Sequence, residues 1–156
     1  MSVEILNESG VEVDVADFVK LARFTLSRLR VHPRAELCLK LVDEATMTEF
    51  NQRWMGQDGP TDVLSFPMDE LRPERGGEPA EEGILGDLLL CPQYAAAQAP
   101  TYSRTAQDEM HLLIIHGILH LLGYDHGEPA EEREMFALQA RLLAEWQGVK
   151  SGEDVE

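Results

Sequence analysis

Cysteine, basic residues and long apolar runs are all scarce in this sequence of 156 residues. Its two cysteines, Cys38 and Cys91, form no CxxC pair and lie in apolar, strand-like segments, so we expect buried free thiols rather than a disulfide or a cysteine metal site. No apolar run is long enough to span a membrane, and the N-terminal residues lack the features of a signal peptide. The sequence therefore predicts a cytoplasmic protein with no membrane partner.

Positive charge is also in short supply, because 13 Lys and Arg residues stand against 29 Asp and Glu, for a formal net charge of -16. This balance opposes nucleic-acid binding in general, and no DNA partner is expected. One segment, residues 18–35, has no acidic residue and contains five basic ones: Lys20, Arg23, Arg28, Arg30 and Arg34. This segment is either a local RNA-binding face or a solvated helix face, and the sequence leaves both open.

The remaining composition, 44% hydrophobic and 27% charged, is typical of one folded domain, which we place at residues 1–148, with a frayed tail at 149–156. Periodicity predicts strands at 3–6, 35–42, 61–66 and 84–91, and helices at 14–30, 43–55, 92–99, 104–122 and 129–146. A long loop, residues 67–83, separates the last two strands. This order predicts an α+β fold with a small mixed β-sheet packed with helices.

Three histidines fall within the eleven residues HGILHLLGYDH, from His116 to His126. Their helix is apolar nearly all round, so we expect it to be buried. His116 and His120 are four residues apart and face one point, while Gly123 can end the helix in a left-handed cap that returns His126 toward them. Three imidazoles with an open fourth position are typical of a catalytic zinc site. We predict one Zn²⁺ per chain, bound by His116, His120 and His126.

The other histidines are interpreted as hydrogen-bonded core residues. His111 lies about 140° around the helix from His116, too far to share the ion, and His32 has no partner histidine nearby in the sequence. For the three clustered histidines, burial without an ion would leave several ring nitrogens unpaired, at roughly 1 to 3 kcal/mol each. Metal binding is therefore the favoured interpretation.

The histidine spacing matches the metzincin pattern H-E-x-x-H-x-x-G-x-x-H, except that Gly117 occupies the position of the glutamate that acts as general base. The sequence therefore predicts a metzincin-like zinc-binding helix without the peptidase base. A zinc metallopeptidase of this type would need an acid or base from outside the helix, and it stays open as an alternative.

The histidine segment, with GPTDVLSFP (59–67) and LGDLLLC (85–91), resembles the YbeY family of single-strand-specific endoribonucleases. The three blocks occur in the family's order. The resemblance implies zinc at the same histidines, single-stranded RNA as the substrate, and a role in small-subunit ribosomal RNA maturation and ribosome quality control. A noncatalytic ribosome-assembly factor, in which zinc only stabilises the fold, is a further alternative.

One position departs from the family pattern, because Met55 stands where members commonly carry an arginine. Arg53, two residues earlier, is the candidate to replace it as a phosphate contact. Two helix positions turn a side chain by about 200°, so this replacement requires an altered helix end.

The reaction expected at such a site is metal-assisted hydrolysis of an RNA phosphodiester, or activation of the neighbouring ribose 2′-hydroxyl by zinc. No residue is identified as the general base. Asp125 and Asp87 are candidates to orient a zinc-bound imidazole, although a turn-stabilising role for Asp125 and a buried hydrogen-bond anchor at Asp87 are simpler. Ser65 is a candidate substrate contact, with an ordinary strand serine as the simpler interpretation.

Overall fold

The computed structural model describes residues 2–71, 74, 76–125 and 127–155, with side chains up to Val149. The described part of the chain contains four strands and five α-helices, and it confirms the predicted α+β class. In chain order the elements are β1 (Ser2–Asn7), α1 (Val15–Arg28), β2 (Glu36–Leu41), α2 (Glu44–Met55), β3 (Val63–Pro67), β4 (Ile84–Leu90), α3 (Pro92–Gln98), the 3₁₀ helix η1 (Ala99–Tyr102), α4 (Ala106–Leu121) and α5 (Pro129–Val155).

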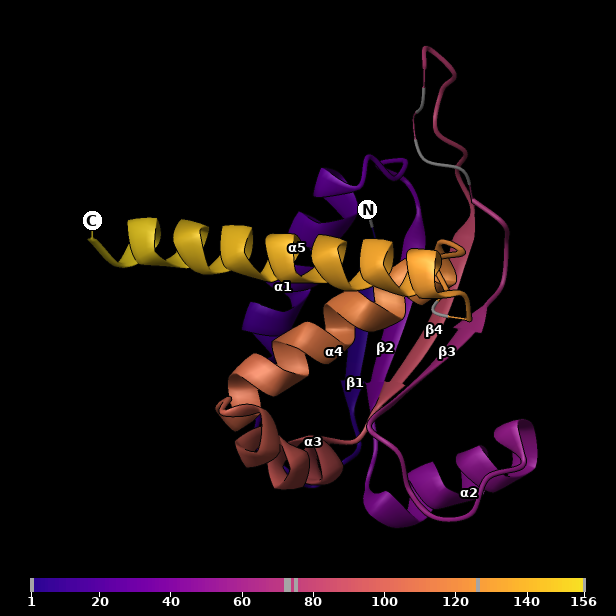
Figure 1. Cartoon of the computed structure of the whole chain (residues 1–156), viewed down its shortest axis with the longest axis vertical. Helices are drawn as coiled ribbons and strands as arrows, with labels where there is room; N and C mark the ends of the chain where they lie inside the picture. Colours follow the sequence, from indigo (N-terminus) through magenta and orange to yellow (C-terminus); the bar gives the residue numbers. More distant parts are fainter. Residues whose placement is uncertain (1, 72–73, 75, 126, 156) are drawn as a thin grey trace.

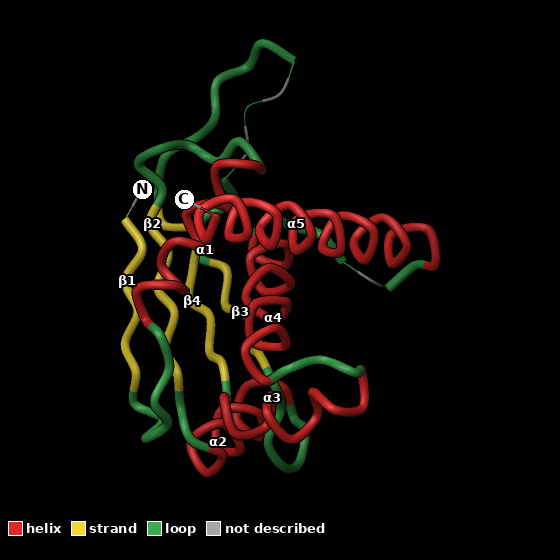
Figure 2. Tube along the Cα trace, turned by 90° about the vertical axis from the view of Figure 1, so that its left-hand side faces the viewer, coloured by secondary structure: helices red, strands yellow, loops and turns green. Residues whose placement is uncertain are grey.

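The sheet has the strand order β1-β2-β4-β3 and is mixed, as predicted. β1, β2 and β4 are parallel, while β3 is antiparallel to β4. β3 is thus an edge strand. Proline is tolerated there, because Pro67 has no N–H to donate to a neighbouring strand. Figure 1 shows α4 and α5 in front of the sheet, and α2 and α3 gathered at one end of it. Figure 2 shows the loop between β3 and β4 projecting from the opposite end.

Helix α4 is the centre of the hydrophobic core, which also takes side chains from α1, α5 and the sheet. Eleven of its 16 residues are buried, because the helix is apolar on nearly every side. Thr105 caps its first turn by accepting a hydrogen bond from the Asp108 N–H. At its other end Gly123 is left-handed (φ 95°), and Gly123 and Tyr124 donate N–H bonds to the carbonyls of His120 and Leu119. The predicted left-handed cap at Gly123 is confirmed.

Gly117 lies where α4 crosses the sheet. A Cβ atom at this position would come within 2.8 Å of Leu88 Cδ2 on β4, a side chain that is fully buried. The glycine therefore permits the close approach of α4 to β4. The position that carries the glutamate base in metzincins here faces the sheet.

The ends of α5 and the positions of two histidines test further predictions. α5 extends to Val155, whereas the sequence predicted an end near Trp146; residues 147–155 contain no proline that would interrupt the helix.

His111 is buried and its Nε2 lies 2.7 Å from Asp17 Oδ2, which confirms its core role. His32 is only half-buried and accepts the Arg34 N–H in the turn before β2, so it is a turn residue rather than a core residue.

Both cysteines are free thiols, as predicted, but only Cys91 is buried; Cys38 is half-buried, because it lies on the face of the sheet that α4 does not cover. Burial raises the pKa of each thiol above its ordinary value, and the nearby Asp87 carboxylate raises the pKa of Cys38 further. Both sulfurs therefore stay protonated at neutral pH. Within the described ranges, no helix combines the length and apolar character that crossing a membrane requires.

Candidate active-site cleft

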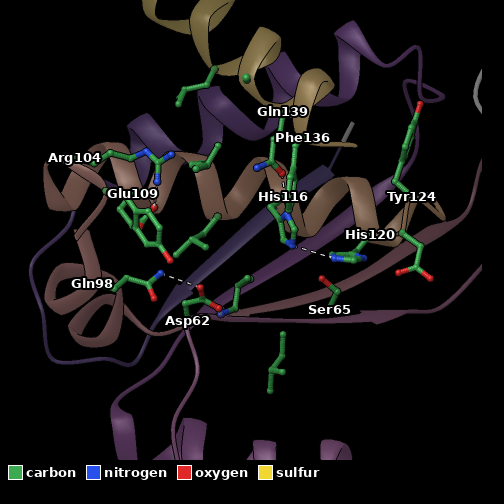
Figure 3. Close-up of a pocket in the computed structure, with 18 of the residues that line it drawn as sticks. Asp62, Ser65, Gln98, Arg104, Glu109, His116, His120, Tyr124, Phe136 and Gln139 are labelled. Atoms are coloured by element: carbon green, nitrogen blue, oxygen red, sulfur yellow. Dashed lines mark hydrogen bonds and ion pairs between the residues drawn. The ribbon is translucent and has the colours of Figure 1, made fainter. Parts of the chain in front are cut away.

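A cleft of about 1190 Å³ lies between the edge strand β3, helix α4 and the middle of α5, from Phe136 to Gln147. Helix α4 forms its floor and presents both His116 and His120 to it. Ser65 reaches it from β3, and Gln139 reaches it from α5 (Figure 3). The cleft thus collects side chains from three elements that are distant in the sequence.

The two histidines form a close pair within this cleft. Their Nε2 atoms lie 3.0 Å apart, and their ring planes are nearly perpendicular, at 81°. On the far side of the first ring, His116 Nδ1 lies 2.8 Å from Gln139 Oε1. An amide oxygen only accepts hydrogen bonds, so Nδ1 carries the proton and donates, and the lone pair of His116 is on Nε2. This is the tautomer in which Nε2 can bind a metal.

The pair fits a zinc ion in its donor chemistry and its spacing. Two nitrogen ligands of a tetrahedral zinc at 2.0 to 2.1 Å are about 3.3 Å from one another, close to the observed separation. Across the described residues, no third His, Cys, Asp or Glu side chain joins His116 and His120. The third predicted ligand, His126, lies outside the described residues.

Two of the other predicted site residues also line the cleft. Asp125 is exposed and lies in the turn that follows Gly123. Ser65 is half-buried, and its hydroxyl donates to the carbonyl oxygen of Gly117 at 3.3 Å. The structure therefore brings Ser65 and Asp125 to the same cleft as His116 and His120.

Asp87 and Arg53 are not brought to the cleft. Gly86 and Leu88 face α4, so Asp87 between them points to the opposite face of the sheet, where it borders a small hollow with Cys38. Arg53 is exposed in the last turn of α2 and is not among the described residues that line the cleft, whereas Met55 is. Neither side chain is therefore in position for its predicted role in this structure.

Several polar residues of the cleft were not predicted from the sequence, among them Gln139, Arg104 and Glu109. Gln139 has no sequence signal, because its contact with His116 depends on how α5 packs on α4. Arg104 and Glu109 form a hydrogen-bonded ion pair at 3.1 Å, and Glu109 is only 2% exposed. Arg104 precedes α4 and Glu109 lies within it, so the spacing of the two residues in the sequence does not predict that they pair.

The fold and the cleft define the protein as a small α+β domain with an imidazole pair presented by a buried central helix. The family model described as Endoribonuclease YbeY matches residues 4–147, so the chain belongs to the YbeY family. The resemblance seen in the three sequence blocks is thereby confirmed.

Relatives and one solved structure agree with this assignment. The chain is 60% identical over 146 residues to Endoribonuclease YbeY of Nocardioides sp. (strain ATCC BAA-499 / JS614), covering 94% of this chain and 98% of the relative. It is 59% identical to Endoribonuclease YbeY of Thermobifida fusca (strain YX), covering 94% of each. The solution structure of TM1509 from Thermotoga maritima superposes with a TM-score of 0.65 at 30% identity, over 97% of this chain and 93% of that one.

Proposed function

We propose that this protein is a metal-dependent endoribonuclease that cleaves single-stranded RNA in the cleft, with Zn²⁺ bound by His116, His120 and His126. The observation that carries the proposal is the facing pair of Nε2 atoms, 3.0 Å apart in an open cleft. Membership of the YbeY family, whose relatives are named endoribonucleases, supports RNA as the substrate class.

The side chains of the cleft have distinct roles in this proposal. Gln139 holds His116 by its Nδ1–H, so that the Nε2 lone pair stays directed into the cleft. When bound, zinc supplies Lewis acidity, which lowers the pKa of water toward about 7 and offsets charge on a phosphate. Ser65 lines the cleft from β3, and because its hydroxyl proton goes to the Gly117 carbonyl, its oxygen would accept a hydrogen bond from a ribose hydroxyl of the strand. Asp125 is placed next in sequence to the third ligand and can orient it.

Two chemical routes remain within the proposal, since the attacking oxygen is either water or the neighbouring ribose 2′-hydroxyl. The product ends distinguish them, because only the second route yields a cyclic phosphate. A metallopeptidase is less well supported, because the peptidase base is replaced by Gly117 and the chain belongs to a family whose relatives are named endoribonucleases.

We further propose that the cellular substrate is ribosomal RNA of the small subunit, processed in the cytoplasm during maturation and quality control. The support is the resemblance of the histidine block, GPTDVLSFP and LGDLLLC to the family. A strain depleted of the protein should accumulate small-subunit RNA with unprocessed ends, and the His120→Ala variant should fail to correct this. Normal ends in the depleted strain would contradict the ribosomal assignment.

The deciding experiment is cleavage of a single-stranded RNA by purified protein of known metal content, before and after chelation. We expect bound zinc, loss of cleavage in chelator and recovery on adding zinc. His120→Ala should abolish cleavage in a protein whose circular dichroism is unchanged, while His32→Ala, outside the cleft, should cut normally. Equal cleavage in chelator would overturn the proposal. If the His120→Ala variant instead unfolds because it no longer binds zinc, the ion only stabilises the fold.

A further inference from the structure

The charges of the cleft are unfavourable for RNA except at one place. Three carboxylates line it, from Asp62, Glu109 and Asp125, and Arg104 is the single Lys or Arg among its described lining residues. Binding of an RNA strand depends on cations that neutralise phosphates. Arg104 is therefore the protein group in the cleft that can attract a phosphate at a distance from the histidines.

Arg104 is held in place by a buried partner. Its Nη1 donates to Glu109 Oε1 at 3.1 Å, and Glu109 is 2% exposed, so the carboxylate cannot move away into solvent. One third of the Arg104 side chain is exposed (33%). A guanidinium has five N–H donors, and described residues accept only one of those of Arg104. The remaining donors are available for a bidentate contact with a phosphate.

An exposed aromatic ring lies beside this guanidinium. Arg104 Cζ is 5.3 Å from the centroid of the Tyr102 ring, and Tyr102 is 58% exposed although it lines the cleft. Ser103 between them is in the left-handed conformation (φ 57°), which turns the chain from η1 into α4 and sets the two side chains together. Aromatic rings and arginine planes are the surfaces on which single-stranded bases stack.

The distance from the histidines is suitable for one strand to reach both. Glu109 and His116 are seven residues apart on α4, which is about 10 Å along the helix axis. That separation corresponds to about three stacked nucleotides, or fewer in an extended strand. Figure 3 shows Arg104 and Glu109 at one end of the cleft and His120 toward the other.

We propose that Tyr102 and Arg104, with Glu109 as positioning residue, form a nucleotide subsite that binds a phosphate and the adjoining base of single-stranded RNA. The proposal rests on the proposed function, since it takes RNA as the occupant of the cleft. It assigns strand binding, rather than bond cleavage, to the α3 end of the cleft.

The test measures binding without turnover. The zinc-loaded protein is titrated into a fluorescent single-stranded oligoribonucleotide of about ten nucleotides, whose 2′-O-methyl riboses and phosphorothioate linkages resist cleavage by either route, and binding is followed by anisotropy. Arg104→Gln should raise Kd roughly tenfold at low salt. It should also reduce the slope of log affinity against log salt by about 0.7, as expected for one lost phosphate contact on a single strand. Tyr102→Ala should raise Kd at least fivefold with the salt slope unchanged.

Matched variants keep the result interpretable. Arg104→Gln leaves the buried Glu109 without its cation, so the Arg104→Gln/Glu109→Gln double variant retains a neutral hydrogen bond there and should show the same loss. Arg141 on α5 is 66% exposed and outside the described lining of the cleft, so Arg141→Gln should bind normally. Wild-type affinity and salt slope in both Arg104 variants would overturn the subsite, as would finding the loss in Arg53→Gln instead.

The same measurements separate this proposal from the proposed function. Because binding is measured on an uncleaved strand, an Arg104-dependent affinity in a protein that cuts no RNA would sustain the subsite and remove the nuclease assignment. Conversely, zinc-dependent cleavage with Kd and KM unchanged by Arg104→Gln and Tyr102→Ala would sustain the nuclease and overturn the subsite.

Discussion

Gln139 on α5 accepts a hydrogen bond from His116 Nδ1 on α4 at 2.8 Å, across 23 residues of sequence. This bond joins the two helices at the cleft and determines which nitrogen of His116 faces it. The binding chemistry of the first histidine is therefore set by a residue that lies on a different helix.

Replacing Gln139 by Leu should weaken zinc binding by about 10- to 100-fold, because the acceptor that fixes the His116 tautomer is lost while the volume is kept. The measurement is competition for zinc against a chromophoric chelator. Gln147→Leu is the matched control, since Gln147 lines the same cleft from the same helix and makes no hydrogen bond to His116. Equal zinc affinity in the two variants would show that the Gln139 contact does not act on the metal.

The buried pair of Asp17 on α1 and His111 on α4 should contribute strongly to stability. Both side chains are only 4% exposed and lie 2.7 Å apart. Replacing either one by Leu leaves the other buried without this partner, and should lower the free energy of unfolding by about 3 kcal/mol. The double variant Asp17→Leu/His111→Leu should lose less than the sum of the two. Urea denaturation of the four proteins measures the coupling, and additive losses would contradict it.

The Asp43 carboxylate should make stability depend on pH in the acid range. The backbone N–H of Thr46, 2.8 Å from Asp43 Oδ1 at the start of α2, lowers the pKa of Asp43 below its ordinary value. A lowered folded pKa means that the contribution is present above the unfolded pKa, about 3.9, and is lost as pH falls through the folded pKa. Asp43→Asn keeps a cap but has no carboxylate, so its stability difference from the native chain should shrink below about pH 4.

The control for this pH dependence is Asp58→Asn, which removes a carboxylate of the following loop that caps no helix. Urea denaturation at several pH values compares the two variants with the native chain. A stability difference for Asp43→Asn that stays constant from neutral pH down to about pH 3 would contradict the capping contribution.

Local signals in the sequence were sufficient for much of the fold. Asp14, Asp43 and Thr105 cap the helices that follow them through short-range hydrogen bonds. Such contacts span only three residues, so they can be inferred without knowing the tertiary structure. The His116–His120 pair was predictable for the same reason, because four residues on a helix fix the relative placement of two side chains.

The remaining site features depend on packing between distant elements. Alternation along β4 predicts that Asp87 and Leu88 face opposite ways, but not which face the helices cover, so the sequence leaves Asp87 as a candidate partner of the histidines. Gln139 and Glu109 reach the cleft only because α5 and the start of α4 pack as they do. No short sequence motif encodes how α5 or the start of α4 packs against its neighbours.

Gly117 should resist replacement because of the same packing. Alanine is favoured over glycine in a helix by about 1 kcal/mol, but its Cβ would press on the buried Leu88, at a cost of about 1 to 3 kcal/mol. We therefore expect Gly117→Ala to lower the free energy of unfolding by about 1 kcal/mol. Gly117→Glu should prevent folding, because it would bury a carboxylate against the sheet without a partner.

Gly148 on α5 provides the control, since a Cβ added there would meet nothing within 4 Å. Gly148→Ala should raise the free energy of unfolding by about 0.5 to 1 kcal/mol, because only the helix preference changes. Opposite signs for the two alanine variants in urea denaturation would establish that Gly117 is required by the contact between α4 and β4. If Gly117→Ala were as stabilising as Gly148→Ala, the glycine would need another explanation. A folded Gly117→Glu variant that cleaves peptides would show that this position can reach the cleft after all.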